Sequence, residues 1–290
     1  MVLEDAQPKH LRIGTMKVEI YPDRKAAGVA AAKAAAGTLI QLGQAHESFS
    51  AIFATGASQL DTLDALTGIE NLPWNQITGF HMDEYVGIDA DHPASFRRYM
   101  RERLASKVHM KEFFEIEGDA SDPEQVARDY AGKLRSADPK LCLLGIGENG
   151  HLAFNDPPVA DFNDGLDAKI VRLDAECRQQ QTSEGWFASV DQVPEYAITL
   201  TIPALMRVPK LIVSVPGPRK ANIVRRAFEE PISTNCPATI LRNHPDVTIY
   251  LDVQSADQLH SATYPDEILS SPQRTNSKSV METRETRKGS

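Results

Sequence analysis

The chain has 290 residues, which is enough for one large α/β domain or two small ones at roughly 150 residues each. Its apolar fraction of 41% is ordinary for a globular protein, and its net charge of −9 argues against a general binder of nucleic acids or anionic membranes. No apolar stretch approaches the roughly 20 residues that span a bilayer, and the N-terminus does not have the order of a signal peptide.

The cysteines indicate a reducing compartment. Cys142, Cys177 and Cys236 are widely spaced and odd in number, which fits free thiols better than a disulfide framework or a thiolate metal site. No set of His, Asp and Glu residues has the spacing of metal ligands. We therefore expect a cytoplasmic protein without a metal.

After a polar lead-in over residues 1–10, the first half of the chain alternates predicted strands and helices. Asp23 can cap an alanine-rich helix over about 23–43, and a second helix over about 59–66 ends at Gly68. A third predicted helix begins near His92, and a fourth covers 122–136. Predicted strands cover 16–20, 51–54, 77–82 and 113–116.

The second half continues the alternation. Predicted strands lie at 141–144, 169–171, 197–200, 211–215 and 247–251, and a helix runs from Arg219 to about Phe228. Residues 174–193 show no clear period. This order predicts an α/β fold, a single doubly wound, mostly parallel sheet with helices on both faces, similar to a Rossmann fold. We expect one domain over 1–265 and a disordered tail over 266–290.

The segment 141–157 is the strongest candidate for a functional site. Its apolar run is typical of a buried strand, and glycines at 145, 147 and 150 then break that strand. Glu148, Asn149, His151 and Asp156 follow, and ligands bind at this edge of open α/β sheets. The alternative is a tight turn in which a histidine and an aspartate form a structural hydrogen bond.

Two other strand ends carry polar residues. Thr55, Gly56, Ala57 and Ser58 precede a helix and can present backbone N–H groups to an anion, although Ser58 could equally be a simple N-cap. Asp83 and Glu84 leave the strand over 77–82. Adjacent acids at such a place are either solvated or capping groups, or a general base. We interpret the preceding His81 as structural.

Separated segments of the chain resemble one family, the glucosamine-6-phosphate deaminases (isomerases), whose wider relatives include the 6-phosphogluconolactonases. The resemblance covers roughly residues 16–252 and rests on Met-Asp-Glu-Tyr-Val-Gly at 82–87 and Gly-His-Leu-Ala-Phe-Asn at 150–155. Ala-Thr-Gly-Ala-Ser at 54–58 and Gly-Pro-Arg-Lys-Ala at 217–221 add to it. Gly-His is shared with the lactonases, whereas Ala-Phe-Asn and Asp-Glu-Tyr favour the deaminases.

The resemblance implies a role for each matching residue. Asp83 matches the carboxylate that moves a proton between C2 and C1 of the open-chain amino sugar, and His151 matches the histidine that opens the ring. Lys220 and the 55–58 turn match the site for the sugar phosphate. Such a reaction is acid–base chemistry, and so we expect no cofactor.

Three positions depart from the family. An acid two residues before the histidine is Asn149 here, and a glutamate five residues after it is Asp156. An asparagine cannot stabilise an imidazolium by charge, and Glu148 is the candidate to replace the missing acid, with Glu84 as a second supporting carboxylate. Where the family has a second phosphate ligand, an arginine, this chain has Glu184, and Arg178 is the candidate substitute.

The sequence therefore predicts an enzyme that converts glucosamine 6-phosphate to fructose 6-phosphate and ammonia. Its expected partner is a small amino-sugar phosphate, with no nucleic acid and no membrane, and a homo-oligomer stays open. One alternative is hydrolysis of a sugar-phosphate lactone with His151 activating water. Another is a sugar-phosphate sensor without catalytic activity.

Overall fold

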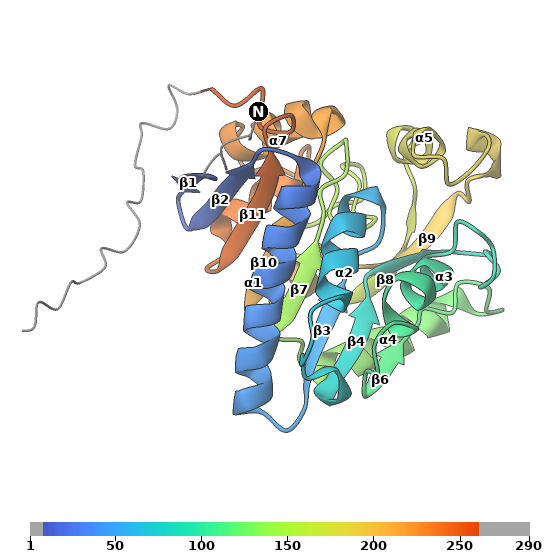
Figure 1. Cartoon of the computed structure of the whole chain (residues 1–290). Coiled ribbons are helices and arrows are strands. Elements are labelled where there is room, and N and C mark those ends of the chain that lie inside the picture. The colour runs from blue at the N-terminus through green and yellow to red at the C-terminus, as the bar shows by residue number, and fades with distance from the viewer. Residues whose placement is uncertain (1–7, 261–290) are drawn as a thin grey trace, which may run out of the picture.

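The computed structural model describes residues 8–260. They form a main sheet of eight strands with helices packed around it (Figure 1). The strands follow the order β1-β2-β11-β10-β7-β3-β4-β6, and every neighbouring pair is parallel except β1 and β2. Their bounds are β1 (Lys9–Ile13), β2 (Met16–Tyr21), β3 (Phe49–Phe53), β4 (Ile77–His81), β6 (Glu112–Phe114), β7 (Leu141–Leu144), β10 (Lys210–Ser214) and β11 (Val247–Asp252).

Helices connect these strands and begin at capping residues that the sequence makes recognisable. Asp23 accepts a hydrogen bond of 2.8 Å from Ala26 N at the start of the longest helix, α1. The helices are α1 (Arg24–Ala45), α2 (Leu60–Thr67), α3 (Phe96–Met100), α4 (Pro123–Ala137), α5 (Ala175–Ser183), α6 (Ile202–Met206) and α7 (Ala221–Glu229).

The central strand β7 shows why helices cover both faces of the sheet. Successive side chains of a strand point to opposite faces. Leu141 and Leu143 pack with α1 and α2, whereas Cys142 and Leu144 pack with α4 and α7. All of these strand residues are buried, as expected for a parallel sheet between two helical layers. The predicted doubly wound sheet is confirmed.

A second, antiparallel sheet was not expected from the sequence. It has the order β5-β9-β8, with β5 (Asp83–Tyr85), β9 (Tyr196–Leu200) and β8 (Ala168–Arg172). The segments predicted at 169–171 and 197–200 are strands, but they belong here and not to the main sheet. Alternating apolar residues identify a strand but not the sheet that it joins. The small sheet has its own apolar cluster, which includes Tyr85 and Phe154, and α5 lies beside it (Figure 1).

The ends of the chain differ from the prediction in one respect. Residues 9 and 10 belong to β1, which pairs with β2 across a turn at Gly14, where φ is +60°. Lys9 and His10, the last two residues of the predicted polar lead-in, lie on an edge strand, which tolerates them because they are exposed to solvent. The predicted tail over 266–290 lies outside the described residues.

The strand order reverses between β3 and β7, which are neighbours in the sheet. From β3 the chain proceeds outward through β4 and β6, whereas from β7 it proceeds the other way through β10 and β11. The two connections therefore leave a crevice at the carboxyl ends of β3 and β7, which is where open α/β sheets bind ligands.

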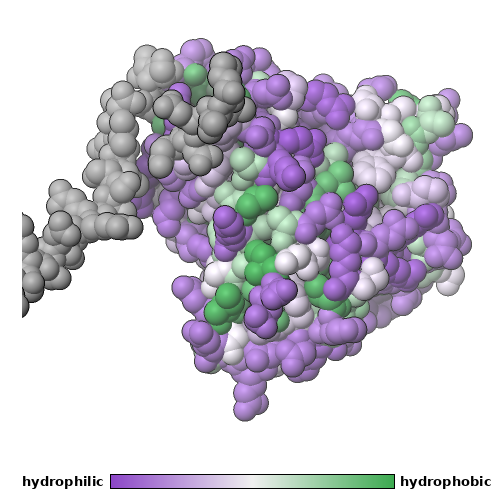
Figure 2. All heavy atoms as spheres, viewed as in Figure 1, coloured by the Kyte–Doolittle hydropathy of each residue, from purple (hydrophilic) through white to green (hydrophobic). Residues whose placement is uncertain are grey.

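The apolar side chains exposed on residues 8–260 do not come from one continuous segment. No helix of residues 8–260 is long and apolar enough to cross a bilayer. The face drawn in Figure 2 is mainly hydrophilic, with hydrophobic residues scattered over its middle. The large apolar side chains that are exposed within residues 8–260 come from separate parts of the chain: Ile40, Leu166, Tyr196, Ile232 and Val253. Homo-oligomerisation stays a prediction.

Candidate active site

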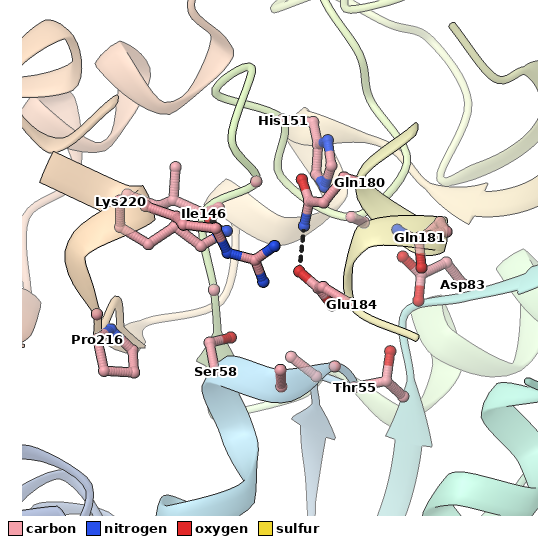
Figure 3. Close-up of a pocket in the computed structure, with 18 of the residues that line it drawn as sticks. Thr55, Ser58, Asp83, Ile146, His151, Gln180, Gln181, Glu184, Pro216 and Lys220 are labelled. Atoms are coloured by element: carbon pink, nitrogen blue, oxygen red, sulfur yellow. Dashed lines mark hydrogen bonds between the residues drawn. The ribbon is translucent and has the colours of Figure 1, made fainter. Parts of the chain in front are cut away.

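A cavity of about 230 Å³ occupies the crevice at the carboxyl ends of β3, β7 and β10 (Figure 3). Its walls come from the turns after these strands, from β5 and from α5. Side chains from all of these elements point into the same space in Figure 3. The sequence-predicted site residues that line it are Thr55, Gly56, Ala57, Ser58, Asp83, His151 and Lys220.

Asp83 is a buried carboxylate that opens onto this cavity. It is the first residue of β5, directly after the chain leaves the main sheet, and only 5% of its surface is exposed. Its Oδ1 atom is buried and accepts no hydrogen bond from any residue of 8–260. Burial raises the pKa of Asp83 well above its usual range, and the nearby carboxylates of Glu84 and Asp156 raise it further. A carboxylate of this kind can accept a proton from a weakly acidic carbon.

His151 also lines the cavity, and Gly147 makes room for its ring. The Gly147 amide donates to the His151 carbonyl at 3.0 Å, which folds the loop back on itself. A Cβ atom at position 147 would lie 2.2 Å from two atoms of the imidazole, closer than atoms can approach. The glycine that breaks the predicted strand is therefore needed for the close approach of the histidine ring.

Asp156 and Asn149 lie behind His151 and do not line the cavity. His151 Nδ1 is 2.9 Å from Asp156 Oδ1, although the two are not aligned as a hydrogen bond. Burial by itself would raise the pKa of Asp156, but His151 and an amide donor from Asn149 bring it below the usual value. Asn149 uses both side-chain atoms in other hydrogen bonds: its Oδ1 accepts from the backbone N of His151 at 3.0 Å, and its Nδ2 donates to Asp156 Oδ1 at 3.0 Å.

The other end of the cavity is suited to an anion. Gly56, with φ of +90°, turns the chain so that Thr55 and Ser58 face the cavity (Figure 3). Lys220 is buried, donates from Nζ to Ile146 O at 2.8 Å, and has a pKa lowered mainly by burial. A buried ammonium beside a turn that begins a helix forms a site for a phosphate-sized anion.

Arg24 and Arg219 also line the cavity and were not predicted as site residues. Arg24 begins α1 and donates to Ala57 O at 3.0 Å, so it supports the 55–58 turn from a neighbouring helix. No sequence signal identifies it, because an arginine at a helix start normally faces solvent. Arg219 directly precedes Lys220 in the segment already singled out.

Arg178 does not line the cavity, which argues against its predicted role as a phosphate ligand. Its guanidinium donates to the carbonyls of Val190 at 2.7 Å and Val193 at 3.0 Å, and so it holds the loop after α5. Glu184 does line the cavity. Its carboxylate accepts from Gln180 Nε2 at 2.7 Å (Figure 3) and from Trp186 Nε1 at 3.1 Å. This position thus brings a negative charge to the cavity.

Glu84 and Glu148 have structural partners. The Glu84 carboxylate accepts from Ser95 Oγ at 2.7 Å and from Arg97 N at 2.9 Å, and so it caps the start of α3. Glu148 lies 3.3 Å from Arg219 Nε. The carboxylate beside the imidazole is Asp156, so Glu148 does not replace the missing acid there.

One group of described residues could hold a metal ion. A nitrogen of His151, a carboxylate oxygen of Asp156 and the sulfur of Cys177 lie within 4.8 Å of one another. A metal would need the thiolate of Cys177, but burial raises the pKa of that thiol well above its ordinary value, and the nearby carboxylates add to the effect. The absence of a metal stays a prediction.

Comparison with known proteins relates this geometry to a family. A glucosamine-6-phosphate deaminase of Listeria innocua is 35% identical over 206 residues, which are 71% of this chain and 86% of the relative. A glucosamine-6-phosphate deaminase of Exiguobacterium sibiricum is 35% identical over 208 residues, or 71% of this chain and 79% of the relative.

Solved structures agree with these relatives. A monomeric glucosamine-6-phosphate deaminase aligns with a TM-score of 0.77 and 30% identity, over 83% of this chain and 99% of its own. The 6-phosphogluconolactonase of Thermotoga maritima aligns with a TM-score of 0.67 and 18% identity, over 82% of this chain and 99% of its own, and shares the fold. The family model of glucosamine-6-phosphate isomerases/6-phosphogluconolactonase matches residues 22–250, and the chain belongs to this family.

Proposed function

We propose that the protein is a cytoplasmic enzyme that converts glucosamine 6-phosphate and water to fructose 6-phosphate and ammonia. The observation that carries this proposal is the buried carboxylate of Asp83, whose Oδ1 accepts no hydrogen bond within residues 8–260 and which shares one cavity with His151. Cys142, Cys177 and Cys236 are buried free thiols, which supports the proposed compartment.

His151 would open the sugar ring. Nδ1 of the imidazole lies 2.9 Å from the Asp156 carboxylate, whose negative charge favours a proton on Nδ1 and leaves Nε2 to exchange protons. In this step the imidazole takes the proton of the anomeric hydroxyl and returns one to the ring oxygen. The C1–O5 bond breaks, and an aldehyde forms at C1.

Asp83 would then carry out the aldose–ketose shift. Its carboxylate takes the proton from C2 to give an enolate amine, the C1 oxygen takes a proton that the amino group releases, and the resulting carboxylic acid returns a proton to C1. The product is a 2-imine, which water hydrolyses to the ketose and ammonia, so that atoms and charge balance without an oxidant. A raised pKa suits this role because the same group must bind and release a proton near neutral pH.

The phosphate would bind at the end formed by Lys220 and the turn from Thr55 to Ser58. The carboxylate of Glu184 faces the same cavity and weakens the attraction for an anion. Arg24 and Arg219 line the cavity as well, but Arg24 lies 2.7 Å from Asp61 and Arg219 lies 3.3 Å from Glu148. The attraction for a phosphate would therefore rest mainly on Lys220.

The test is an assay of purified protein with glucosamine 6-phosphate in which ammonium and fructose 6-phosphate are both measured. We expect equal release of the two products, and loss of at least 100-fold in rate for Asp83→Asn, within the contribution of about 10² to 10⁴ from a general base. Asp91→Asn is the matched control, because that side chain is 95% exposed and outside the cavity. A folded wild-type protein that releases neither product contradicts the proposal.

Lactone hydrolysis is the competing reaction in this family. Attack of water on a lactone carbonyl needs no proton transfer between C1 and C2, so the buried Asp83 would have no role in that reaction. Turnover of a 6-phosphogluconolactone that survives Asp83→Asn, without release of ammonia from the amino sugar, would replace the proposed function by this one.

A further inference from the structure

We propose that Asp174 is a positioning residue for His151, acting through the side-chain amide of Asn149. This inference rests on the proposed function for its kinetic test. It concerns how the imidazole is held, and it assigns a task to an aspartate that the sequence had not singled out.

The bridge consists of one amide between two carboxylates. Asn149 Nδ2 donates to Asp156 Oδ1 at 3.0 Å and lies 3.2 Å from Asp174 Oδ2. The backbone N of Asp174 donates to the second oxygen of Asp156 at 3.2 Å. Asp174 therefore contacts the Asp156 carboxylate directly through its backbone and indirectly through Asn149.

Asp174 also fixes the helix that forms one wall of the cavity. Its Oδ1 accepts from Cys177 N at 2.6 Å and caps the N-terminus of α5. Gln180, Gln181 and Glu184, which follow in or directly after α5, line the cavity. One aspartate thus couples the support of the histidine to the position of this wall.

The bridge needs an amide at position 149, because only a donor can lie between two ionised carboxylates. Asn149 Oδ1 is already used by the backbone N of His151, which orients Nδ2 toward Asp156 and Asp174. A carboxyl group at 149 would face both carboxylates at these short distances. Like charges so close cannot all remain ionised, and one group must keep a proton.

Several acidic groups surround the bridge, so the effect of a carboxyl group at position 149 depends on whether it is protonated. Asp156 comes from the His151 loop, Asp174 and Cys177 come from the start of α5, and Asp83 comes from β5. Within the described residues, these acidic groups and the imidazole are the titratable groups that face the bridge. A protonated carboxyl at 149 can donate as the amide does, whereas an ionised one repels Asp156.

We therefore expect Asn149→Asp to keep most of its kcat/KM at pH 6 and to lose at least tenfold at pH 8, relative to the wild type. Adding Asp174→Asn to this variant should raise its kcat/KM at least threefold at pH 8, because it removes one of the three neighbouring negative charges at positions 149, 156 and 174. Asp174→Asn alone should lower kcat several-fold with little change in KM.

A matched variant separates positioning from helix capping. Asp122 caps α4 as Asp174 caps α5, accepting from Gln125 N at 2.9 Å, but it comes from a different helix and is not part of the bridge between Asn149 and Asp156. Asparagine caps a helix about as well as aspartate. Asp122→Asn should thus leave both the stability and the pH profile of the enzyme unchanged. If Asp174→Asn has the same rate and the same pH profile as Asp122→Asn, the proposal is contradicted.

A second measurement does not depend on turnover. Nitrogen-15 NMR of the His151 ring distinguishes a proton on Nδ1 from one on Nε2. We expect a single Nδ1–H form in the wild type and a mixture in Asp174→Asn. If the wild type releases no product from glucosamine 6-phosphate, the proposed function fails but this measurement still decides the role of Asp174. If Asp174→Asn still shows the single Nδ1–H form, the proposed positioning role of Asp174 is refuted.

Discussion

Asp83→Asn is expected to abolish turnover and, at the same time, to stabilise the folded protein. The carboxylate is buried, and its Oδ1 finds no hydrogen-bond donor in the described part of the chain. A buried polar atom without a partner costs about 1 to 3 kcal/mol, and more when it carries a charge. Asparagine still places a polar group at this position but carries no charge, and we therefore expect the variant to gain about 1 to 3 kcal/mol in the free energy of unfolding at pH 8.

The pH dependence of this gain has a definite sign. The pKa of Asp83 is raised in the folded protein, so the neutral acid is favoured there. The contribution of such a group to stability is fully present below the unfolded pKa of about 3.9 and is lost as the pH rises through the folded pKa. The asparagine variant does not titrate at this position. Its advantage over the wild type should therefore grow from pH 5 to pH 8.

Urea unfolding followed by circular dichroism at pH 5, 6, 7 and 8 measures this advantage, with ammonia release measured on the same samples. Asp91→Asn controls for the loss of an exposed carboxylate. A variant that is less stable than the wild type at pH 8, or an advantage that shrinks as the pH rises, would refute the reasoning about Asp83.

Other predictions concern the two ends of the cavity. Lys220→Met should raise KM for glucosamine 6-phosphate at least tenfold, because a buried cation is lost from the anion end, and steady-state kinetics with unphosphorylated glucosamine should show no such change. Glu184→Gln should lower KM several-fold, with the effect fading at high salt as screening increases. Gly147→Ala should lower kcat at least 100-fold, because its Cβ would displace the His151 ring, whereas Gly165→Ala, which has open space, should be neutral in the same assay.

The sequence predicted the main sheet because its signals there are local. The alanine-rich segment after Asp23, for example, predicts a helix over 23–43, and α1 covers Arg24–Ala45. Pairing across the chain is a different matter. Asp83–Tyr85 follows β4 after a single residue, so the chain gives no sign that it leaves the main sheet and pairs with β9 at Ala197–Thr199. That pairing is determined by tertiary packing.

The site was predictable where residues follow a strand and not where they lie on a helix. Thr55 and Lys220 follow strands whose carboxyl ends meet at one edge, so that order alone brings them together. Gln180 and Glu184 lie in or next to α5, in a segment that shows no clear period. Arg178 is on the same helix but donates to the loop carbonyls instead of facing the cavity. Which face of α5 meets the cavity depends on contacts that sequence spacing does not reveal.

His81 lies two residues before Asp83 and is also buried. Its contribution to the stability of the fold should change with pH in the opposite direction. Burial lowers the pKa of His81 to about 3, and its Nε2 accepts from Ile116 N at 2.8 Å, which requires the neutral ring. The unfolded chain binds a proton on this histidine below its usual pKa of about 6.5, so stability falls by about 1.4 kcal/mol for each pH unit below that value.

His81→Gln retains an acceptor for the Ile116 amide and removes the titration. Between pH 6.5 and 4.5 the wild type should therefore lose about 2 to 3 kcal/mol more unfolding free energy than the variant, as measured by urea unfolding. The titration of Asp83 is present in both proteins and cancels from this difference. Parallel decline of the two proteins would mean that His81 is charged in the folded state, and the structural role assigned to it would then be wrong.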